Sequence, residues 1–242
     1  MGRAHEVRAA SMAKTAAKKS KLYAKFGKEI YMAAKEGGPD PNGNLTLRRL
    51  IERAKQAQVP ADVIKRNIEK SQGGVGEDYS PSRYEGFGPG GSTVIIECLS
   101  DNANRTFGEV RSCFTKTGGK IGVSGSVSYL YDYSSHISFS GMTADEALEV
   151  MLENECEIRD IETDGDVVTI IGEPQDLDKI KDALTEANSN LTFFIDQVAY
   201  FPHDYITLSD EDLDKFTRFI DLLEDLDDVQ EVYHNVKLPE TE

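Results

Sequence analysis

The sequence is organised around one glycine-rich stretch, Arg83-Tyr84-Glu85-Gly86-Phe87-Gly88-Pro89-Gly90-Gly91, because the charge of the chain changes sign on its two sides. Residues 1–70 hold 16 Lys and Arg against 7 Asp and Glu, a net charge of +9. Residues 71–242 hold 11 against 36, a net charge of −25, so the whole chain carries −16. A local basic excess of this kind is typical of proteins that bind polyanions. The first part is therefore a candidate nucleic-acid-binding region in a chain that is acidic overall.

The glycine-rich stretch matches G-x-G-x-x-G as a string at residues 86–91. A dinucleotide site needs a strand before this string and a helix after it. Here an apolar segment, residues 93–99, predicts a strand after it. We therefore expect the glycines to let the backbone turn tightly beside Tyr84 and Phe87, and we expect no nucleotide site or other cofactor.

The first basic segment predicts a long amphipathic helix over residues 11–36. Its apolar side chains, including Leu22, Phe26 and Ile30, recur at steps of three and four residues, and residues 37–39 (Gly-Gly-Pro) end the pattern. A stripe of lysines is spaced to lie roughly opposite this face: Lys14, Lys18, Lys21, Lys25 and Lys28.

Two readings of the lysine stripe stay open. A run of lysines is most often a solvated helix face. However, residues 12–28 hold six lysines and no acid, whereas exposed helices usually alternate Glu with Lys for support. A polyanion would relieve that repulsion.

Two shorter helices follow in the basic part. Asn44 is a good N-cap for the first, and Pro60 suits the first turn of the second. The sequence thus predicts a three-helix domain over residues 1–75, with residues 73–76 as a flexible link. The cations of these two helices that we expect to contact phosphates are Arg48, Arg49, Arg53, Lys65 and Arg66.

The acidic part predicts two α/β units, one inside the other. Residues 134–202 read as strand, helix, two strands, helix and strand, the order of a ferredoxin-like unit. The flanking segments predict the two halves of another unit, with strands at 93–99, 126–133, 204–208 and 229–235 and helices at 104–116 and 210–226. We expect a multidomain α+β protein whose middle domain, residues 80–133 plus 203–238, contains the third domain, 134–202, as an insertion. Two consecutive domains are the alternative.

Catalytic and metal-binding patterns are missing from the sequence. Cys98, Cys113 and Cys156 are far apart, and the four histidines are isolated, so we expect no metal site and no nucleophile pair. Acidic runs at 210–212 and 224–228 are typical of solvated faces, and they could also repel nucleic acid from that side. No segment has the length and apolar character of a membrane-spanning helix.

Several patches, taken in order, resemble the YebC family and, within it, the YeeN-like branch. They are residues 1–4 (Met-Gly-Arg-Ala), 37–41 (Gly-Gly-Pro-Asp-Pro), 57–60 (Ala-Gln-Val-Pro), the stretch 83–91, and 101–106 (Asp-Asn-Ala-Asn-Arg-Thr). The resemblance covers essentially the whole chain. It implies a helical first domain, two α/β domains and a bacterial-type cytoplasm.

The resemblance also implies a function in gene expression, since family members are described as DNA-binding transcriptional regulators and as translation factors acting on the ribosome. We therefore predict a non-enzymatic nucleic-acid-binding regulator that binds duplex DNA, with ribosomal RNA and the ribosome as the alternative partner, in a monomeric or weakly dimeric cytoplasmic protein. Besides the cations above, the resemblance suggests a second contact patch: Tyr84, Phe87, Asn102, Asn104 and Arg105.

Overall fold

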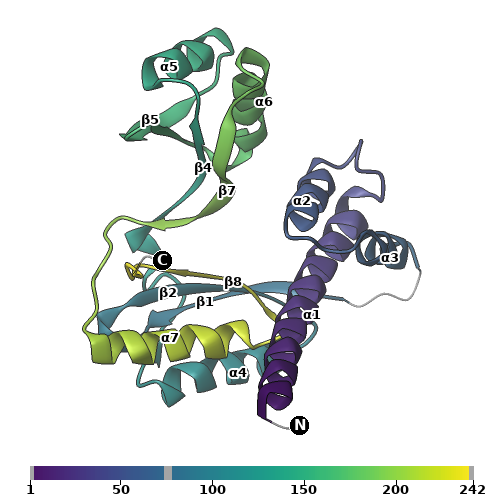
Figure 1. Cartoon of the computed structure of the whole chain (residues 1–242), viewed down its shortest axis with the longest axis vertical. Coiled ribbons are helices and arrows are strands. Elements are labelled where there is room, and N and C mark those ends of the chain that lie inside the picture. Colours follow the sequence, from purple (N-terminus) through teal and green to yellow (C-terminus); the bar gives the residue numbers. More distant parts are fainter. Residues whose placement is uncertain (1–2, 74–77, 240–242) are drawn as a thin grey trace. The chain divides into compact units, whose positions relative to one another are not determined.

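A computed structural model describes residues 3–73 and 78–239, and for residues 3–17 it describes the helical backbone alone. The chain divides into two compact units. The first comprises Met1–Gly91, Ile96–Val123 and Ser209–Val232, and the second comprises Ser92–Ile95, Ser124–Leu208 and Tyr233–Glu242. Figure 1 labels the helices and strands of both.

Three helices open the first unit, as predicted. They are α1 (Arg3–Gly37), α2 (Leu45–Gln56) and α3 (Ala61–Ser71). Their common core holds Ile30, Ala34, Leu47, Ala54 and Ile64, all buried. Of the predicted link, residues 74–76 lie outside the described part of the chain.

The N-cap predicted at Asn44 is confirmed, and it does more than cap α2. The Asn44 side chain accepts a hydrogen bond from the Leu47 amide at 3.0 Å, as an N-cap does. Its amide nitrogen also donates to the carbonyl oxygens of Ala33 and Gly38, at 2.7 and 2.8 Å. One buried side chain thereby ties the start of α2 to the end of α1.

The first sheet has the strand order β3-β1-β2-β8. Its strands are β1 (Ser80–Phe87), β2 (Thr93–Ser100), β3 (Lys120–Ile121) and β8 (Val229–His234). The helices α4 (Ala103–Lys116) and α7 (Asp210–Glu224) lie side by side along it (Figure 1), and the rings of Phe114 and Phe219 meet between them at 4.8 Å. A Cβ at Gly86 would lie 2.6 Å from the Phe114 ring, so this glycine lets α4 approach β1.

The glycines turn as predicted at Pro89–Gly91, the 3-10 helix η1, where Gly90 and Gly91 have positive φ, but the strand β1 that precedes them was not predicted. Two predictions about this sheet were wrong. The predicted strand at 126–133 is instead a 3-10 turn, η2 (Ser128–Leu130), followed by the strand β4 (Tyr131–Ser140), while the short β3 joins the sheet. The segment 204–208 contributes one isolated bridge, between Ile206 and Val236.

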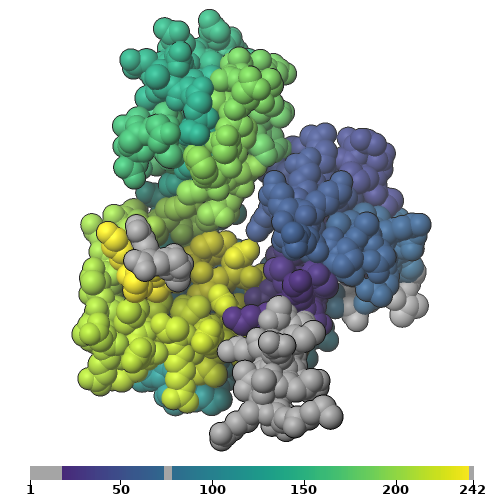
Figure 2. Space-filling model, in the orientation of Figure 1, coloured from purple at the N-terminus to yellow at the C-terminus, as the bar shows by residue number. Residues whose placement is uncertain are grey.

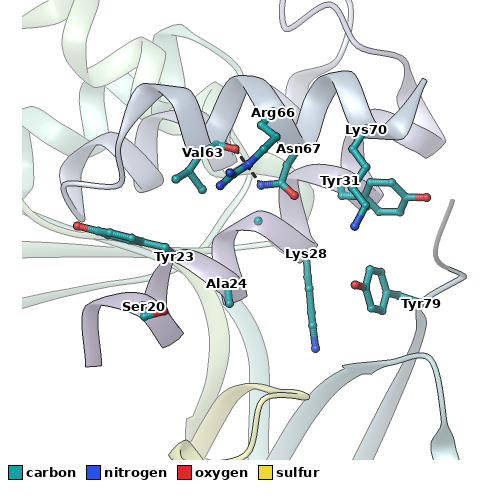
Figure 3. A pocket seen from close by; sticks show the side chains of 11 residues that line it. Ser20, Tyr23, Ala24, Lys28, Tyr31, Val63, Arg66, Asn67, Lys70 and Tyr79 are labelled. Atoms are coloured by element: carbon teal, nitrogen blue, oxygen red, sulfur yellow. Dashed lines mark hydrogen bonds between the residues drawn. The ribbon is translucent and has the colours of Figure 1, made fainter. Parts of the chain in front are cut away.

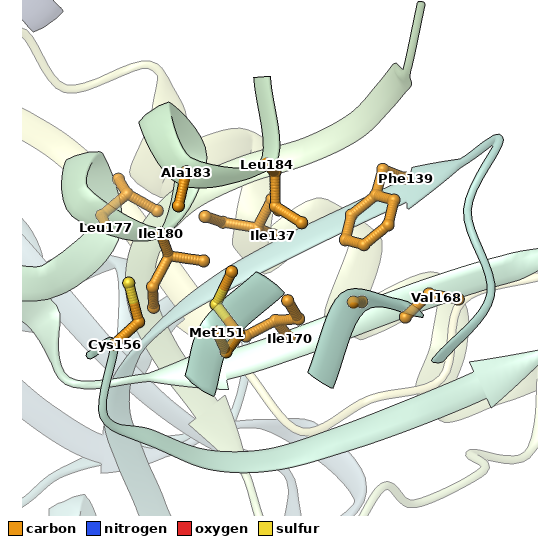
Figure 4. Close-up of a cluster of buried hydrophobic side chains, with 11 residues drawn as sticks. Ile137, Phe139, Met151, Cys156, Val168, Ile170, Leu177, Ile180, Ala183 and Leu184 are labelled. Carbon is orange, nitrogen blue, oxygen red and sulfur yellow. The ribbon is translucent and has the colours of Figure 1, made fainter. Parts of the chain in front are cut away.

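The second unit contains the ferredoxin-like fold that the sequence predicted. Its elements are β4 (Tyr131–Ser140), α5 (Ala144–Glu153), β5 (Ile158–Asp164), β6 (Val167–Gly172), η3 (Pro174–Asp176), α6 (Leu177–Ala187) and β7 (Thr192–Pro202). The strands pair antiparallel in the order β5-β6-β4-β7. The two helices pack on one face of this sheet, where Ile137, Phe139, Met151, Ile170 and Leu184 form a dry core (Figure 4).

The two sheets differ in strand order along the chain. With its strands numbered in chain order, the first sheet has the order 3-1-2-4, whereas the second has the order 2-3-1-4. The two orders become the same if β1, the first strand of the chain, is counted after β3. In the chain, β8 comes after β7, so the residues of the second sheet interrupt those of the first. The α+β multidomain prediction is confirmed, whereas the exact domain boundaries stay a prediction. Among the described residues, no helix is long and apolar enough to cross a membrane.

Candidate nucleic-acid interface

Two lysines of the predicted stripe are bound by acids of the first unit. Lys21 Nζ donates to Asp225 Oδ1 at 2.7 Å and to the Asp225 carbonyl oxygen at 2.9 Å. Lys28 Nζ donates to Asp228 Oδ1 at 2.8 Å and to the Asp227 carbonyl oxygen at 2.9 Å. The acidic run 224–228, expected to be a solvated face, therefore neutralises part of the lysine stripe.

Asp228 is the centre of this contact and is itself buried, with 4% of its surface exposed. Its Oδ2 accepts hydrogen bonds from Ser100 Oγ at 2.9 Å, Thr106 Oγ1 at 2.8 Å and Arg105 Nη2 at 2.6 Å. Burial alone would raise the pKa of Asp228, but the hydrogen bonds from Lys28, Arg105, Thr106 and Ser100 outweigh it and lower that pKa. The carboxylate is thus a charged anchor for α1 and α4.

A second acid of this region, Glu29, is half-buried and follows Lys28 on α1. Burial raises the pKa of Glu29 to about 7, while the charge of Arg53 lowers it and the charge of Glu231 raises it. Arg53 Nη2 and Glu231 Oε1 lie 3.3 Å apart. Arg53, one of the predicted phosphate contacts, therefore already has an acidic partner within the protein.

The remaining predicted cations of the helices are more open. Lys18 is exposed, Lys25 is half-buried, and the side chain of Lys14 lies outside those described. On α2 and α3, Arg48, Lys65 and Arg66 are exposed and Arg49 is half-buried; Lys65 Nζ lies 3.7 Å from Oε1 of its neighbour Glu69. Figure 2 shows these two helices, coloured blue, as a continuous outer surface.

The second predicted patch is not a single surface. Tyr84 donates to the Ala103 carbonyl oxygen at 3.4 Å, so it lies at the start of α4. Phe87 is three positions along the same strand, and its side chain therefore points to the opposite face. Asn102 caps α4 by accepting from the Arg105 amide at 3.1 Å. Asn104 is exposed, but Arg105 is held by Asp101 and Asp228, which raise its pKa.

A pocket of about 510 Å³ opens between α1, α3 and Tyr79. Figure 3 shows Tyr23 at one end and Tyr79 at the other, with Arg66, Asn67 and Lys70 reaching in from α3. The ring of Tyr31, almost fully buried, packs edge-on against the Tyr79 ring at 5.9 Å. The pocket thus has aromatic walls and a basic rim.

Cations lie against the aromatic rings of this pocket. Lys28 Nζ is 5.3 Å from the centre of the Tyr79 ring, and Lys70 Nζ is 5.8 Å from that of Tyr31. The Lys28 charge is already neutralised by Asp228. Among the described residues, Arg66 has no ion-pair or hydrogen-bond partner, so its guanidinium is the cation best placed to meet an anion in the pocket.

The floor of the pocket depends on a glycine inside α1. A Cβ at Gly27 would lie 2.9 Å from Asn67 Nδ2, so the glycine leaves room for the Asn67 amide group against α1. Asn67 Nδ2 donates to the Val63 carbonyl oxygen at 2.8 Å, which leaves the Asn67 side-chain oxygen as an acceptor.

Sequence reasoning included Lys28 and Arg66 but missed the other polar and aromatic residues of the pocket. A usable signal was present on α1. Tyr23, Gly27 and Tyr31 are spaced by four residues and therefore share one helix face. A glycine between two tyrosines on a helix face marks a place where another element can approach closely beside aromatic rings.

Neither a metal-binding cluster nor a reactive thiol is found in the described part of the chain. No cluster of three or more His, Cys, Asp or Glu residues among the described residues could hold a metal ion. Burial raises the pKa of the Cys98 thiol to about 12 and also raises those of Cys113 and Cys156, which disfavours reactive thiolates. The residues that converge in the first unit are cations, tyrosines and an amide.

The fold and the site define a class of multidomain α+β protein with basic N-terminal helices and two ferredoxin-like sheets. Residues 3–74 match the N-terminal domain model of the TACO1/YebC protein, and residues 79–236 match the model of the TACO1/YebC second and third domain. The chain belongs to the TACO1/YebC family.

Relatives of known sequence and structure agree with this assignment. The chain is 50% identical to a "probable transcriptional regulatory protein" of Alteromonas mediterranea, over 99% of this chain and 100% of the relative. A protein of the same name from Vibrio campbellii is 50% identical over 98% of this chain and 100% of the relative. The crystal structure of a conserved hypothetical protein from Aquifex aeolicus is similar with a TM-score of 0.74 at 35% identity, covering 92% of each chain.

Proposed function

We propose that this protein is a non-enzymatic regulator of gene expression that binds duplex DNA through its N-terminal helices. The observation that carries the proposal is the basic outer surface of α2 and α3. Residues 45–71 hold seven Lys and Arg against three Asp and Glu, a net charge of +4. Exposed cations on short helices meet phosphates and position a protein on a duplex. The names of the bacterial relatives support regulation of transcription as the role.

One observation favours a second candidate, a translation factor that binds ribosomal RNA. The pocket beside this surface combines tyrosine rings with cations. Proteins recognise RNA largely through unstacked bases in loops and ends, which stack on aromatic side chains, whereas the bases of a duplex are not free to do so.

The experiment is a salt titration of binding by the full-length protein, with labelled duplex DNA and a folded ribosomal RNA fragment as probes. Replacing Arg48, Lys65 and Arg66 with Gln should weaken binding to the true ligand and reduce the slope of log K against log salt by about 2 to 3, because each phosphate contact contributes about 0.9 on a duplex. The matched control replaces three exposed cations of α4 and β3, Arg111, Lys116 and Lys120, with Gln. Equal losses in both triple variants would contradict the proposal, since binding would then follow net charge alone.

A further inference from the structure

We infer that the pocket between α1, α3 and Tyr79 binds one unstacked nucleotide, with its base against the tyrosines and its phosphate on Arg66. Where the nucleotide belongs to a polynucleotide, the inference rests on the second candidate function, the binding of RNA, because a duplex offers no unstacked base. It goes further by assigning a site and a ligand unit that a surface of exposed cations does not specify.

The size and walls of the pocket suit a nucleobase. A volume of about 510 Å³ lies in the usual range of small-molecule sites. Tyr23 and Tyr79 stand at its two ends, and both side chains are half-buried, so aromatic carbon lines the space at either end (Figure 3). Stacking of bases on aromatic rings tolerates different bases, because every base has a π face.

The polar groups fit the other parts of a nucleotide. Arg66 has no ion-pair partner among the described residues, and its planar guanidinium matches a phosphate through two parallel hydrogen bonds. The Asn67 side-chain oxygen can accept a hydrogen bond from an amino or imino group of a base. Lys70, from the same helix, adds positive charge at the pocket. An apolar ligand would leave the Arg66 guanidinium without an anion, so the lining favours an anionic aromatic ligand.

The first measurement is the binding of AMP, GMP, CMP and UMP to the full-length protein. Calorimetry and tyrosine fluorescence monitor the binding, and the fluorescence signal is usable because the chain has no Trp. Ribose 5-phosphate and inorganic phosphate are the probes without a base. We expect the mononucleotides to bind more tightly than ribose 5-phosphate. Tyr79→Leu should weaken mononucleotides about tenfold and leave ribose 5-phosphate unchanged, because one stacked base is lost.

Two further variants guard against a folding defect at Tyr79. Gly27→Ala should displace the Asn67 amide and weaken mononucleotides without touching an aromatic ring. Arg66→Gln should weaken every probe that carries phosphate. The matched control is Tyr129→Leu, which removes a tyrosine that is 69% exposed and lies in the second unit. Thermal unfolding of each variant shows that it is folded.

Competition with a labelled single-stranded oligonucleotide distinguishes the two sources of the nucleotide. Displacement of the oligonucleotide by AMP, together with weaker oligonucleotide binding in Tyr79→Leu, would place one residue of a polynucleotide in the pocket. AMP binding that leaves the oligonucleotide in place would support a free nucleotide as ligand.

If mononucleotides bind while no polynucleotide does, the proposed function fails and the pocket assignment stands. Polynucleotide binding that is indifferent to Tyr79→Leu and Gly27→Ala, with no mononucleotide bound, would overturn the inference and leave the proposed function intact.

Discussion

The cations of α1 and those of α2 and α3 look alike in the sequence but have different surroundings in the structure. Lys21 and Lys28 of α1 are held by Asp225 and Asp228, more than 190 positions away along the chain. Arg48 and Arg66, on the shorter helices, are exposed. A positive net charge therefore counts two kinds of residue, those that hold the first unit together and those that are open to a ligand. Only the second kind adds to an interaction surface.

The largest expected effect is a loss of stability when Asp228, the acid that holds α1, is replaced. Asp228→Asn is expected to lower the free energy of unfolding by about 4 kcal/mol, because Lys28 and Arg105 lose a buried ionised partner. Urea denaturation at pH 7 measures this. Because the folded state lowers the pKa of Asp228, the stability that this carboxylate contributes is fully present above its unfolded-state pKa. That stability is lost as the pH falls from the unfolded-state pKa to the lower folded-state pKa, so wild type and variant should converge in acid.

The control for this variant is Asp225→Asn, whose side chain is 73% exposed although it binds Lys21. Exposed ion pairs contribute less than about 1 kcal/mol. Similar losses in the two variants would contradict the division between buried anchor and surface contact.

A smaller effect is expected from Glu29, the acid on α1 with a raised pKa. Between the unfolded-state value near 4.5 and the folded-state value near 7, the folded protein binds more protons than the unfolded chain. Stability should therefore fall as the pH rises through this window. Glu29→Gln should remove that slope and stabilise the protein at pH 8. At about 1.4 kcal/mol per pKa unit the whole shift would be worth about 3 kcal/mol, and partial solvent exposure of Glu29 reduces the expected gain to about 2 kcal/mol.

Urea denaturation between pH 5 and pH 8 tests this prediction. Glu36→Gln, a change at an exposed position of the same helix, is the control and should keep the wild-type slope. A flat wild-type profile across the window would show that Glu29 is ionised in the folded protein.

The smallest expected effect concerns the ligand rather than stability. Asp225→Asn releases Lys21 and removes a nearby negative charge, so affinity for the nucleic acid should rise about twofold at low salt, as one further phosphate contact would allow. Fluorescence anisotropy at two salt concentrations measures the change. The matched control is Asp214→Asn, which removes one negative charge from an exposed residue of α7 that makes no ion pair among the described residues. An equal gain in that control would assign the effect to net charge.

Local patterns in the sequence predicted the second sheet and most helices. The Asn44 cap depends on a few neighbouring residues, so the sequence is enough to predict it. Alternation of large side chains was a less reliable signal. Val127, Tyr129 and Tyr131 alternate like a strand, yet Val127 and Tyr131 are buried around a 3-10 turn, and the Tyr131 hydroxyl donates to the Thr93 carbonyl oxygen at 2.8 Å.

The site was less predictable because its contacts join distant parts of the chain. Lys21 and Asp225 are 204 positions apart, and no local rule pairs them. Tyr79 lies beyond the third helix, so its approach to Tyr31 follows from how the chain returns after α3. Spacing could place the lysines on one helix face, but it could not show which of them meet an acid.

The anchor at Asp228 also has a consequence for synthesis on the ribosome. Lys28 is translated early, and its partner follows 200 residues later. At about 5–20 residues per second, the interval is on the order of 10 to 40 s. During that time the newly made helix displays its lysines without the carboxylates that will hold two of them. The N-terminal segment therefore reaches its final charge state only after Asp225 and Asp228 have been made, and until then the growing chain carries an unshielded basic arm.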